Sequence, residues 1–258
     1  MSASPLADTD DAKNPMTDSA ATMTDEKPAR VRDSFAHVDT WVFDLDDTLY
    51  PRSVDLHGQM RERVVTFIAD HMKIDRATAQ AVHVDYYERF GSTLQGMVQL
   101  HGISPNAFLD FVHQIDLSVL VHNEDLIGAL EALPGRRIIF TNAPRGHATS
   151  ALKAMGMADL FDAIASIEDS NFVGKPNLSA FSGFFEAHGV NPRQAAMFED
   201  RPGNLLVPHE LGMKTVLVVD PLFEDANRVV KPPQADLVIT ELTGFLRQLI
   251  IRDQSLNS

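Results

Sequence analysis

From residue 40 onward, short apolar segments of strand length alternate with longer segments of helical period. This alternation is typical of a parallel sheet whose connecting helices cover both faces. It therefore predicts a doubly wound, Rossmann-like α/β core. The expected strands are 41–44, 137–141, 162–166, 196–200, 215–219 and 236–240, and the expected core helices are 145–155, 177–187, 202–211 and 241–251.

One connection in this pattern is much longer than a crossover requires. The first strand ends near Asp44 and the next begins near Arg137, whereas a crossover between parallel strands needs only about a dozen residues. The intervening chain has helical periodicity at 57–72, 76–90, 105–115 and 123–133. We predict an inserted helical cap at 51–133 and an α/β core made of 35–50 and 134–252.

The first 34 residues differ in composition from the rest. They are rich in Ser, Thr, Ala, Asp and Pro, and no basic region precedes an apolar one. We therefore expect a disordered tail at 1–34 and no secretory signal. The sequence contains no cysteine, which excludes disulfides, thiolate catalysis and zinc-thiolate sites and fits a cytoplasmic location.

The charge of the chain limits the partners that we expect. Its formal net charge is -14, and no cluster of Lys and Arg offsets the repulsion of a nucleic-acid backbone. No apolar run approaches the length of a membrane span. We expect neither nucleic acid nor membrane as a partner, and the sequence gives no indication of oligomeric state. An anionic small substrate would need local positive charge, a metal or backbone amides.

Two carboxylates follow the first predicted strand, in the segment "WVFDLDDTLY". Residues two apart in an extended segment point the same way, so Asp44 and Asp46 can face one site. One carboxylate can attack phosphorus while the other moves protons. An all-oxygen site of this kind suits Mg²⁺, which would hold the phosphate nearby. The alternative is an ordinary turn or helix cap, since Asp and Thr favour both.

Polar residues also follow three later strands, where ligands of open α/β sheets bind. Thr141 and the backbone amide of Asn142 can bind phosphate oxygens at a helix N-terminus. Lys175 can neutralise an attacking carboxylate, and Glu199 with Asp200 can complete a metal site. Taken singly, each has an ordinary alternative: a helix cap, a surface-loop lysine, or an acidic helix start.

The order of these four motifs resembles the haloacid dehalogenase-like (HAD) superfamily over about residues 40 to 220. The resemblance implies that Asp44 is the nucleophile and that Asp46 is the general acid and base. It further implies phosphate binding by Thr141, Asn142 and Lys175, Mg²⁺ binding by Asp44, Asp200 and the Asp46 carbonyl, and supporting contacts from Glu199 and Asn204. The dehalogenase branch lacks an acid at the Asp46 position, which favours phosphoryl chemistry. Arg201 and Pro202 depart from the small or polar residues common there.

The cap segment "YYERFGSTLQGM" is similar to the pyrimidine 5'-nucleotidase branch, which has a Tyr-Gly-Thr-Thr-Leu-x-Gly-Leu type sequence. This likeness implies a nucleoside monophosphate substrate with a pyrimidine base. The candidate hydrogen-bonding residues are Ser92, Thr93 and Gln95, and the candidate stacking residues are Tyr86, Tyr87 and Phe90. The alternative is that the aromatic residues form the cap's own core and that Gly91 and Gly96 merely break helices.

The predicted function is a Mg²⁺-dependent phosphomonoester hydrolase that forms a phospho-aspartyl intermediate on Asp44. Three alternatives remain: a phosphatase of phosphoglycolate or a sugar phosphate, a phosphomutase, and a catalytically idle interaction protein. The cap histidines have no metal-ligand spacing, and we expect them to be surface or packing residues; they are His57, His71, His83, His101, His113 and His122.

Overall fold

The computed structural model describes residues 28–223 and 230–250. Six strands form one sheet in the order β3-β2-β1-β4-β5-β6, and every neighbouring pair is parallel. The strands are β1 Thr40–Phe43, β2 Arg136–Phe140, β3 Ala163–Ala165, β4 Ala195–Glu199, β5 Lys214–Val218 and β6 Leu237–Ile239. This parallel sheet with flanking helices confirms the predicted α/β fold class.

Helices occupy most of the remaining described chain. The α-helices are α1 Pro28–Phe35, α2 Leu56–Met72, α3 Arg76–Phe90, α4 Thr93–His101, α5 Pro105–Val112, α6 Glu124–Glu131, α7 Arg145–Ala154, α8 Leu178–His188, α9 Leu206–Glu210 and α10 Leu242–Ile250. Short 3₁₀ helices lie at Arg52–Val54, Ile167–Ser170, Pro192–Gln194 and Pro202–Leu205. In the described helices, no segment is both long and apolar enough to cross a membrane.

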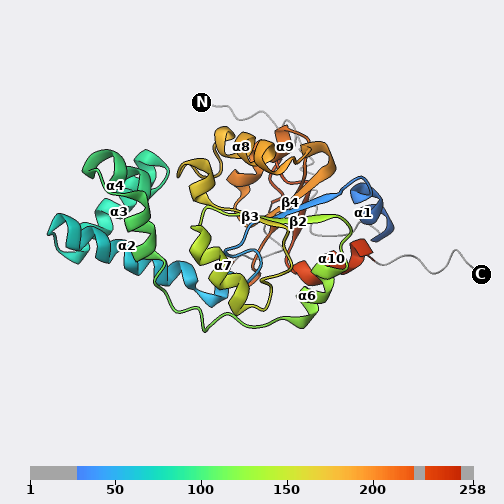
Figure 1. The fold of residues 1–258 in the computed structure, drawn as a ribbon, viewed down its shortest axis with the longest axis horizontal. Coiled ribbons are helices and arrows are strands. Elements are labelled where there is room, and N and C mark those ends of the chain that lie inside the picture. Colours follow the sequence, from blue (N-terminus) through green and yellow to red (C-terminus); the bar gives the residue numbers. More distant parts are fainter. Residues whose placement is uncertain (1–27, 224–229, 251–258) are drawn as a thin grey trace, which may run out of the picture.

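The two faces of the sheet are covered by different helices. Side chains alternate between the faces along each strand, so Phe43 packs on one face and Val42 on the other. Helices α1, α6, α7 and α10 cover the first face, and α8 and α9 cover the second (Figure 1). Phe43 stacks on Phe198 of β4 with ring centroids 4.7 Å apart. Burial on both faces explains why most residues of the strands are apolar.

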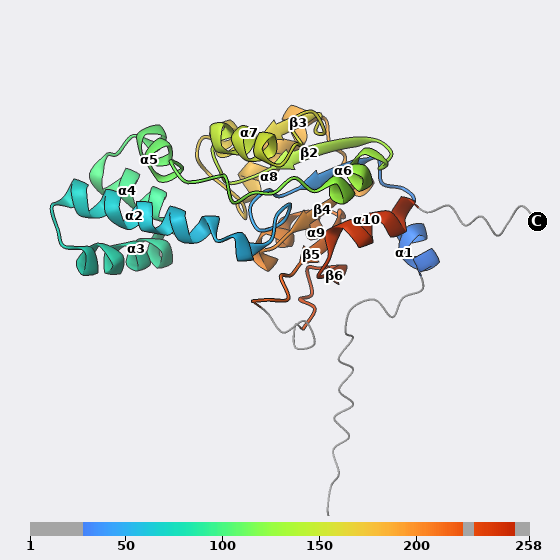
Figure 2. The ribbon, with the colours of Figure 1, turned by 90° about the horizontal axis from the view of Figure 1, so that it is seen from below.

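Helices α2 to α5 pack on one another beyond the sheet (Figure 2). The chain enters α2 shortly after the carboxyl end of β1, so these helices stand next to that edge of the sheet. Gly91 closes α3 with a φ of 77°, a conformation that favours glycine. A Cβ atom on Gly96 would lie 2.5 Å from the Tyr86 ring, so glycine lets α4 approach α3 closely.

The described structure corrects the prediction of a disordered tail at 28–34. These residues belong to α1, whose Val31 and Phe35 are buried against α10. Phe35 stacks on Trp41 at 6.2 Å and meets Phe245 edge-on at 5.7 Å. Polar composition hid this helix because, among its residues 30–35, only Val31 and Phe35 enter the core. Residues 1–27 of the predicted tail and 251–252 of the predicted core lie outside the described residues.

The boundary predicted at residue 133 also differs from the structure. Helix α6 packs on α10 and contributes Leu126, Ala129 and Leu130 to the core cluster, although we expected it in the cap. Its periodicity showed an apolar face but not the partner of that face. Helix α4 was not expected as a separate helix, because two glycines interrupt its pattern.

Candidate active site

The polar residues meet where the chain order in the sheet reverses. β2 and β4 lie on opposite sides of β1, and the Asp44 amide donates to the Phe198 carbonyl at 2.9 Å. Ligands of open α/β sheets bind beyond the carboxyl ends of the strands at such a position. Asp44, directly after β1, and Glu199, at the end of β4, therefore lie close together although they are 155 positions apart in sequence (199 minus 44).

A buried lysine joins these two acids. The Lys175 Nζ atom lies 3.0 Å from Asp44 Oδ1 and 3.0 Å from Glu199 Oε2, and it donates to the Phe140 carbonyl at 2.7 Å. Burial acts to lower the pKa of Lys175, but the charges of Asp44 and Glu199 outweigh it and raise that pKa. The lysine is thus a fixed positive charge beside the Asp44 carboxylate.

Three carboxylates could hold a divalent cation. Asp44, Glu199 and Asp200 each offer an oxygen, and these oxygens lie within 4.8 Å of one another. Burial, together with the charges of Asp44 and Asp47, raises the pKa of Asp200 to about 7. A cation would relieve this repulsion, and an all-oxygen donor set fits a hard metal. Glu199 also accepts bonds from Lys175 and Asn204, which suits a supporting position for it.

Asp46 is held by two donors to the same oxygen. His147 Nε2 lies 2.9 Å from Asp46 Oδ1, and the Tyr50 hydroxyl donates to that atom too. Burial acts to raise the pKa of Asp46, but the bonds from His147 and Tyr50 prevail and lower it to about 2. Sequence reasoning missed His147. The sequence shows only a histidine in the first turn of the helix that follows the Thr141 motif, which by itself does not indicate a contact with Asp46.

The predicted phosphate-binding residues lie at the same edge. The Thr141 side chain is buried, and its hydroxyl accepts from the Ala143 amide at 3.0 Å. The Asn142 side chain makes two hydrogen bonds with the Lys175 backbone. Its Nδ2 atom donates to the Lys175 carbonyl at 2.9 Å, and the Lys175 backbone amide donates to its Oδ1 atom at 2.8 Å. The Asn142 side chain therefore fixes the lysine loop, which leaves its backbone amide as the group for phosphate.

The predicted specificity residues of the cap have partners of their own. The Ser92 hydroxyl accepts from the Gln95 amide at 3.2 Å and caps α4. Thr93 is buried, and its Oγ1 lies 2.6 Å from His83 Nδ1. Gln95 Nε2 donates to the Phe172 carbonyl of the core at 2.7 Å. These contacts build and anchor the cap.

Aromatic residues of α3 divide between the cap's interior and its contact with the core. Tyr86 is buried, bonds His101 through its hydroxyl at 2.6 Å, and meets Phe90 edge-on at 5.8 Å. Tyr87 is exposed, and its hydroxyl accepts from the Arg201 guanidinium. Arg201, the residue that departs from the family pattern, is therefore a bridge from the core to the cap.

The cap histidines have packing and surface contacts. His57 Nδ1 lies 2.9 Å from Asp47 Oδ2, and this hydrogen bond raises the pKa of His57 to about 9. His113 Nδ1 donates to the Leu109 carbonyl at 2.9 Å. Further contacts join His71 to His101, His83 to Thr93, and His122 to Glu124.

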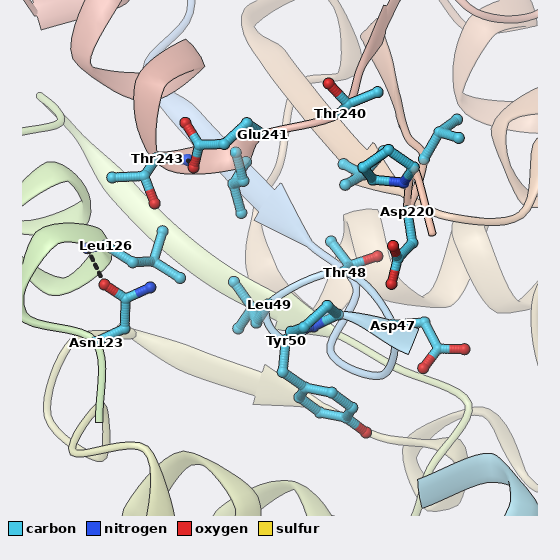
Figure 3. A pocket seen from close by; sticks show the side chains of 15 residues that line it. Asp47, Thr48, Leu49, Tyr50, Asn123, Leu126, Asp220, Thr240, Glu241 and Thr243 are labelled. Carbon is cyan, nitrogen blue, oxygen red and sulfur yellow. Dashed lines mark hydrogen bonds between the residues drawn. The ribbon is translucent and has the colours of Figure 1, made fainter. Parts of the chain in front are cut away.

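A pocket of about 200 Å³ lies beside residues 47–51, in the loop that follows β1 (Figure 3). Thr48 and Tyr50 form one wall, Asn123 at the start of α6 forms another, and the ends of β5 and β6 close it. Neither Asp44 nor Asp46 lines this pocket. It borders the site but does not contain the proposed reacting groups.

Residues 38–212 match a family model described as haloacid dehalogenase-like hydrolase. The chain is 25% identical over 230 residues to Phosphate metabolism protein 8 of Saccharomyces cerevisiae, covering 82% of this chain and 71% of the relative. It is 31% identical over 105 residues to Validoxylamine A 7'-phosphate phosphatase of Streptomyces hygroscopicus subsp. limoneus, covering 41% of this chain and 46% of that relative. A HAD phosphatase structure from Thermococcus onnurineus superposes with a TM-score of 0.57 and 21% sequence identity, covering 82% of this chain and 97% of that structure's chain.

Proposed function

The chain belongs to the haloacid dehalogenase-like hydrolases, and from this membership we propose that it is a Mg²⁺-dependent phosphomonoester hydrolase. The observation that carries the proposal is the buried contact between Lys175 Nζ and Asp44 Oδ1 at 3.0 Å. Asp44 is also one of three acids, with Glu199 and Asp200, whose carboxylate oxygens lie within 4.8 Å of one another. This arrangement places the Asp44 carboxylate beside a fixed positive charge, where a phosphate and a cation would meet. The relative named as a phosphatase supports the same reaction class.

The proposed reaction has two steps, both performed on phosphorus. An oxygen of Asp44 bonds to phosphorus while the ester bond breaks, and Asp46 gives its proton to the leaving oxygen. Asp46 then takes a proton from water as that water attacks the aspartyl phosphate, which frees Asp44 and inorganic phosphate. Mg²⁺, held by Asp44, Asp200 and the Asp46 carbonyl, would offset the negative charge of the phosphate.

The protonation of Asp46 needs the substrate. With a pKa of about 2, Asp46 is ionised at neutral pH in the free protein. A phosphate dianion bound next to it raises its pKa, because two like charges disfavour one another. The proton needed for the leaving group is thereby taken up as the substrate binds. Thr141, the Asn142 amide and Lys175 would hold the phosphate oxygens during both steps.

For the substrate we propose a nucleoside 5'-monophosphate with a pyrimidine base. Support comes from the similarity of residues 90–97 to the pyrimidine nucleotidase sequence. A second candidate is another small phosphate, such as a sugar phosphate. It is favoured by the internal partners of Ser92 and Thr93, and by the name of the relative that acts on a 7'-phosphate.

Replacement of the proposed nucleophile tests the reaction. Asp44→Asn should lower phosphate release by about 10⁴-fold or more, because an amide cannot form the acyl-phosphate. EDTA should abolish activity in the wild type, and added Mg²⁺ should restore it. Wild-type rates in the Asn variant would contradict the mechanism, provided that circular dichroism shows both proteins folded.

A substrate panel separates the two candidate substrates. Phosphate release would be measured for pyrimidine and purine nucleoside monophosphates, phosphoglycolate and sugar phosphates, each with an EDTA control. The proposal expects the highest kcat/KM for a pyrimidine nucleotide. A preference for phosphoglycolate or a sugar phosphate would overturn the substrate while leaving the reaction class intact.

A further inference from the structure

His147 is a buried histidine that no predicted role includes. Its side chain is 0% exposed, and its Nε2 atom lies 2.9 Å from Asp46 Oδ1. We propose that His147 is a positioning residue that, together with Tyr50, holds Asp46 Oδ1 so that Oδ2 carries the proton to and from the substrate. This inference rests on the proposed phosphatase function, since it assigns a task to the acid of that reaction.

The hydrogen bonds single out one oxygen of the carboxylate. Asp46 Oδ1 accepts from both His147 Nε2 and the Tyr50 hydroxyl. Because an ionised carboxylate only accepts, His147 carries its proton on Nε2 in this contact. A proton taken up by Asp46 then goes to Oδ2, because both donors already occupy Oδ1. The carboxylate cannot rotate to exchange its oxygens without breaking two bonds.

The chain holds His147 firmly. It lies in the first turn of α7, directly after the Thr141 loop that is proposed to bind phosphate. The helix start is fixed because the Arg145 amide donates to the Glu168 carboxylate at 3.1 Å. The ring of His113, which follows α5, covers His147 with centroids 5.0 Å apart. Support for Asp46 therefore comes from the core and from the end of the cap.

A role in packing alone explains this residue poorly. His147 Nδ1 is buried and has no hydrogen-bond partner among the described residues. Leaving a polar atom buried without a partner costs about 1 to 3 kcal/mol, which an apolar side chain would avoid. His147 is therefore retained at some cost in stability, and the bond to Asp46 is the contact that an apolar side chain cannot replace.

The inference predicts a dependence on the leaving group. An alkyl phosphate requires proton donation from Asp46, whereas p-nitrophenyl phosphate leaves as a stable anion and requires little. The kcat/KM value is the quantity to compare, because it reports the steps up to formation of the aspartyl phosphate. A change in later hydrolysis, which both substrates share, does not enter it.

The experiment compares His147→Leu with His147→Gln, whose amide reaches the Nε2 position. In His147→Leu, we expect kcat/KM to fall about 10²-fold for the alkyl phosphate that the wild type cleaves fastest, and less than about fivefold for p-nitrophenyl phosphate. His147→Gln should recover most of the loss. Equal losses on both substrates, or no rescue by Gln, would overturn the inference.

Two further measurements keep the test decisive. If circular dichroism shows that His147→Leu does not fold, His147→Asn replaces it, since the shorter amide is polar but does not reach Asp46. We expect the same difference between the losses of kcat/KM for the alkyl phosphate and for p-nitrophenyl phosphate. If the wild type releases no phosphate from either substrate with Mg²⁺, the proposed function itself fails. A normal wild type with equal losses in the variants contradicts only the role of His147.

Discussion

The carboxyl edge of the sheet and the α3–α4 region of the cap both contain buried polar residues, but those residues differ in what they contact. At the sheet edge, Lys175 lies between two carboxylates, and Asp200 has a raised pKa because it is buried close to the charges of Asp44 and Asp47. In the cap, Ser92 caps a helix and Thr93 contacts His83, so these neutral groups are paired locally.

This difference gives a way to distinguish residues that act on a ligand from residues that stabilise the fold in a single structure. Neutral polar groups that satisfy one another stabilise the segment they belong to. Buried charges of the same sign do not stabilise a fold, and they are found where a ligand completes the balance. By this criterion we propose that the chemistry takes place at the sheet edge and that the contacts of Ser92 and Thr93 stabilise the cap.

The largest effect on stability is expected from removing the lysine at the sheet edge. Lys175→Met should lower kcat/KM at least about 10³-fold and lower the free energy of unfolding by about 3 kcal/mol at pH 8, because it leaves two carboxylates buried without a cation. Urea unfolding and phosphate release measure the two effects.

A matched lysine elsewhere in the core provides the control. The Lys214 Nζ atom lies 3.8 Å from Asp236 Oδ1, and both side chains are 29% exposed. Lys214→Met should cost less than about 1 kcal/mol and leave kcat/KM unchanged. If the two lysine variants lost equal stability, the contrast between the sheet edge and the rest of the molecule would be broken.

Replacing Asp200 is expected to raise the free energy of unfolding of the metal-free protein, by less than Lys175→Met lowers it. Its pKa of about 7 in the folded protein exceeds its ordinary value of 3.8, so between those pH values the folded form binds more protons than the unfolded form. Stability of the metal-free protein should therefore fall as pH rises from about 4 to 7. In EDTA, Asp200→Asn should be more stable than the wild type at pH 8, on the order of 2 kcal/mol, and equal to it near pH 4.

Added Mg²⁺ sharpens the Asp200 prediction. The cation should raise the melting temperature of the wild type and have much less effect on Asp200→Asn, because the variant lacks a ligand. A variant that is less stable than the wild type at pH 8 in EDTA would show that Asp200 is stabilising, contrary to the raised pKa.

The smallest effects are expected in the cap. Thr93→Val and Ser92→Ala should each lower the free energy of unfolding by about 1 kcal/mol, through loss of the His83 contact and of the α4 cap. Both should keep kcat/KM within about twofold of the wild type. A tenfold rise in KM for nucleotides alone would instead place these hydroxyls in substrate recognition and weaken the contrast.

The sequence predicted the sheet well because each strand is an apolar segment followed by a polar residue. The ends of β1 and β4 were expected within one residue of where they lie. Residues that act across long separations were harder to predict. His147 and Asp46 are 101 positions apart, and nothing local to α7 indicates that its histidine meets a carboxylate. The same limit applies to α6, whose apolar face was visible but whose partner α10 was not.

The roles of the cap residues could not be predicted from residue type. Ser, Thr and Gln can each bind a base, cap a helix or join two segments, and the choice depends on the surrounding fold. Gln95 illustrates this, since its amide bonds the Phe172 carbonyl of a loop 77 positions away. The alternative that Gly91 and Gly96 merely break helices agrees with Gly91, which closes α3, but Gly96 lies inside α4, where it permits close packing on Tyr86.

The position of Trp41 makes the two regions optically distinguishable. It is the single tryptophan of the chain, it is buried on β1 three residues before Asp44, and its indole donates to the Pro134 carbonyl at 2.6 Å. Two of the three tyrosines, Tyr86 and Tyr87, lie on α3. Tryptophan fluorescence therefore reports on the sheet and on the packing of α1. Tyrosine absorbance reports mainly on the cap. Unfolding curves from the two chromophores can show whether the cap melts before the core.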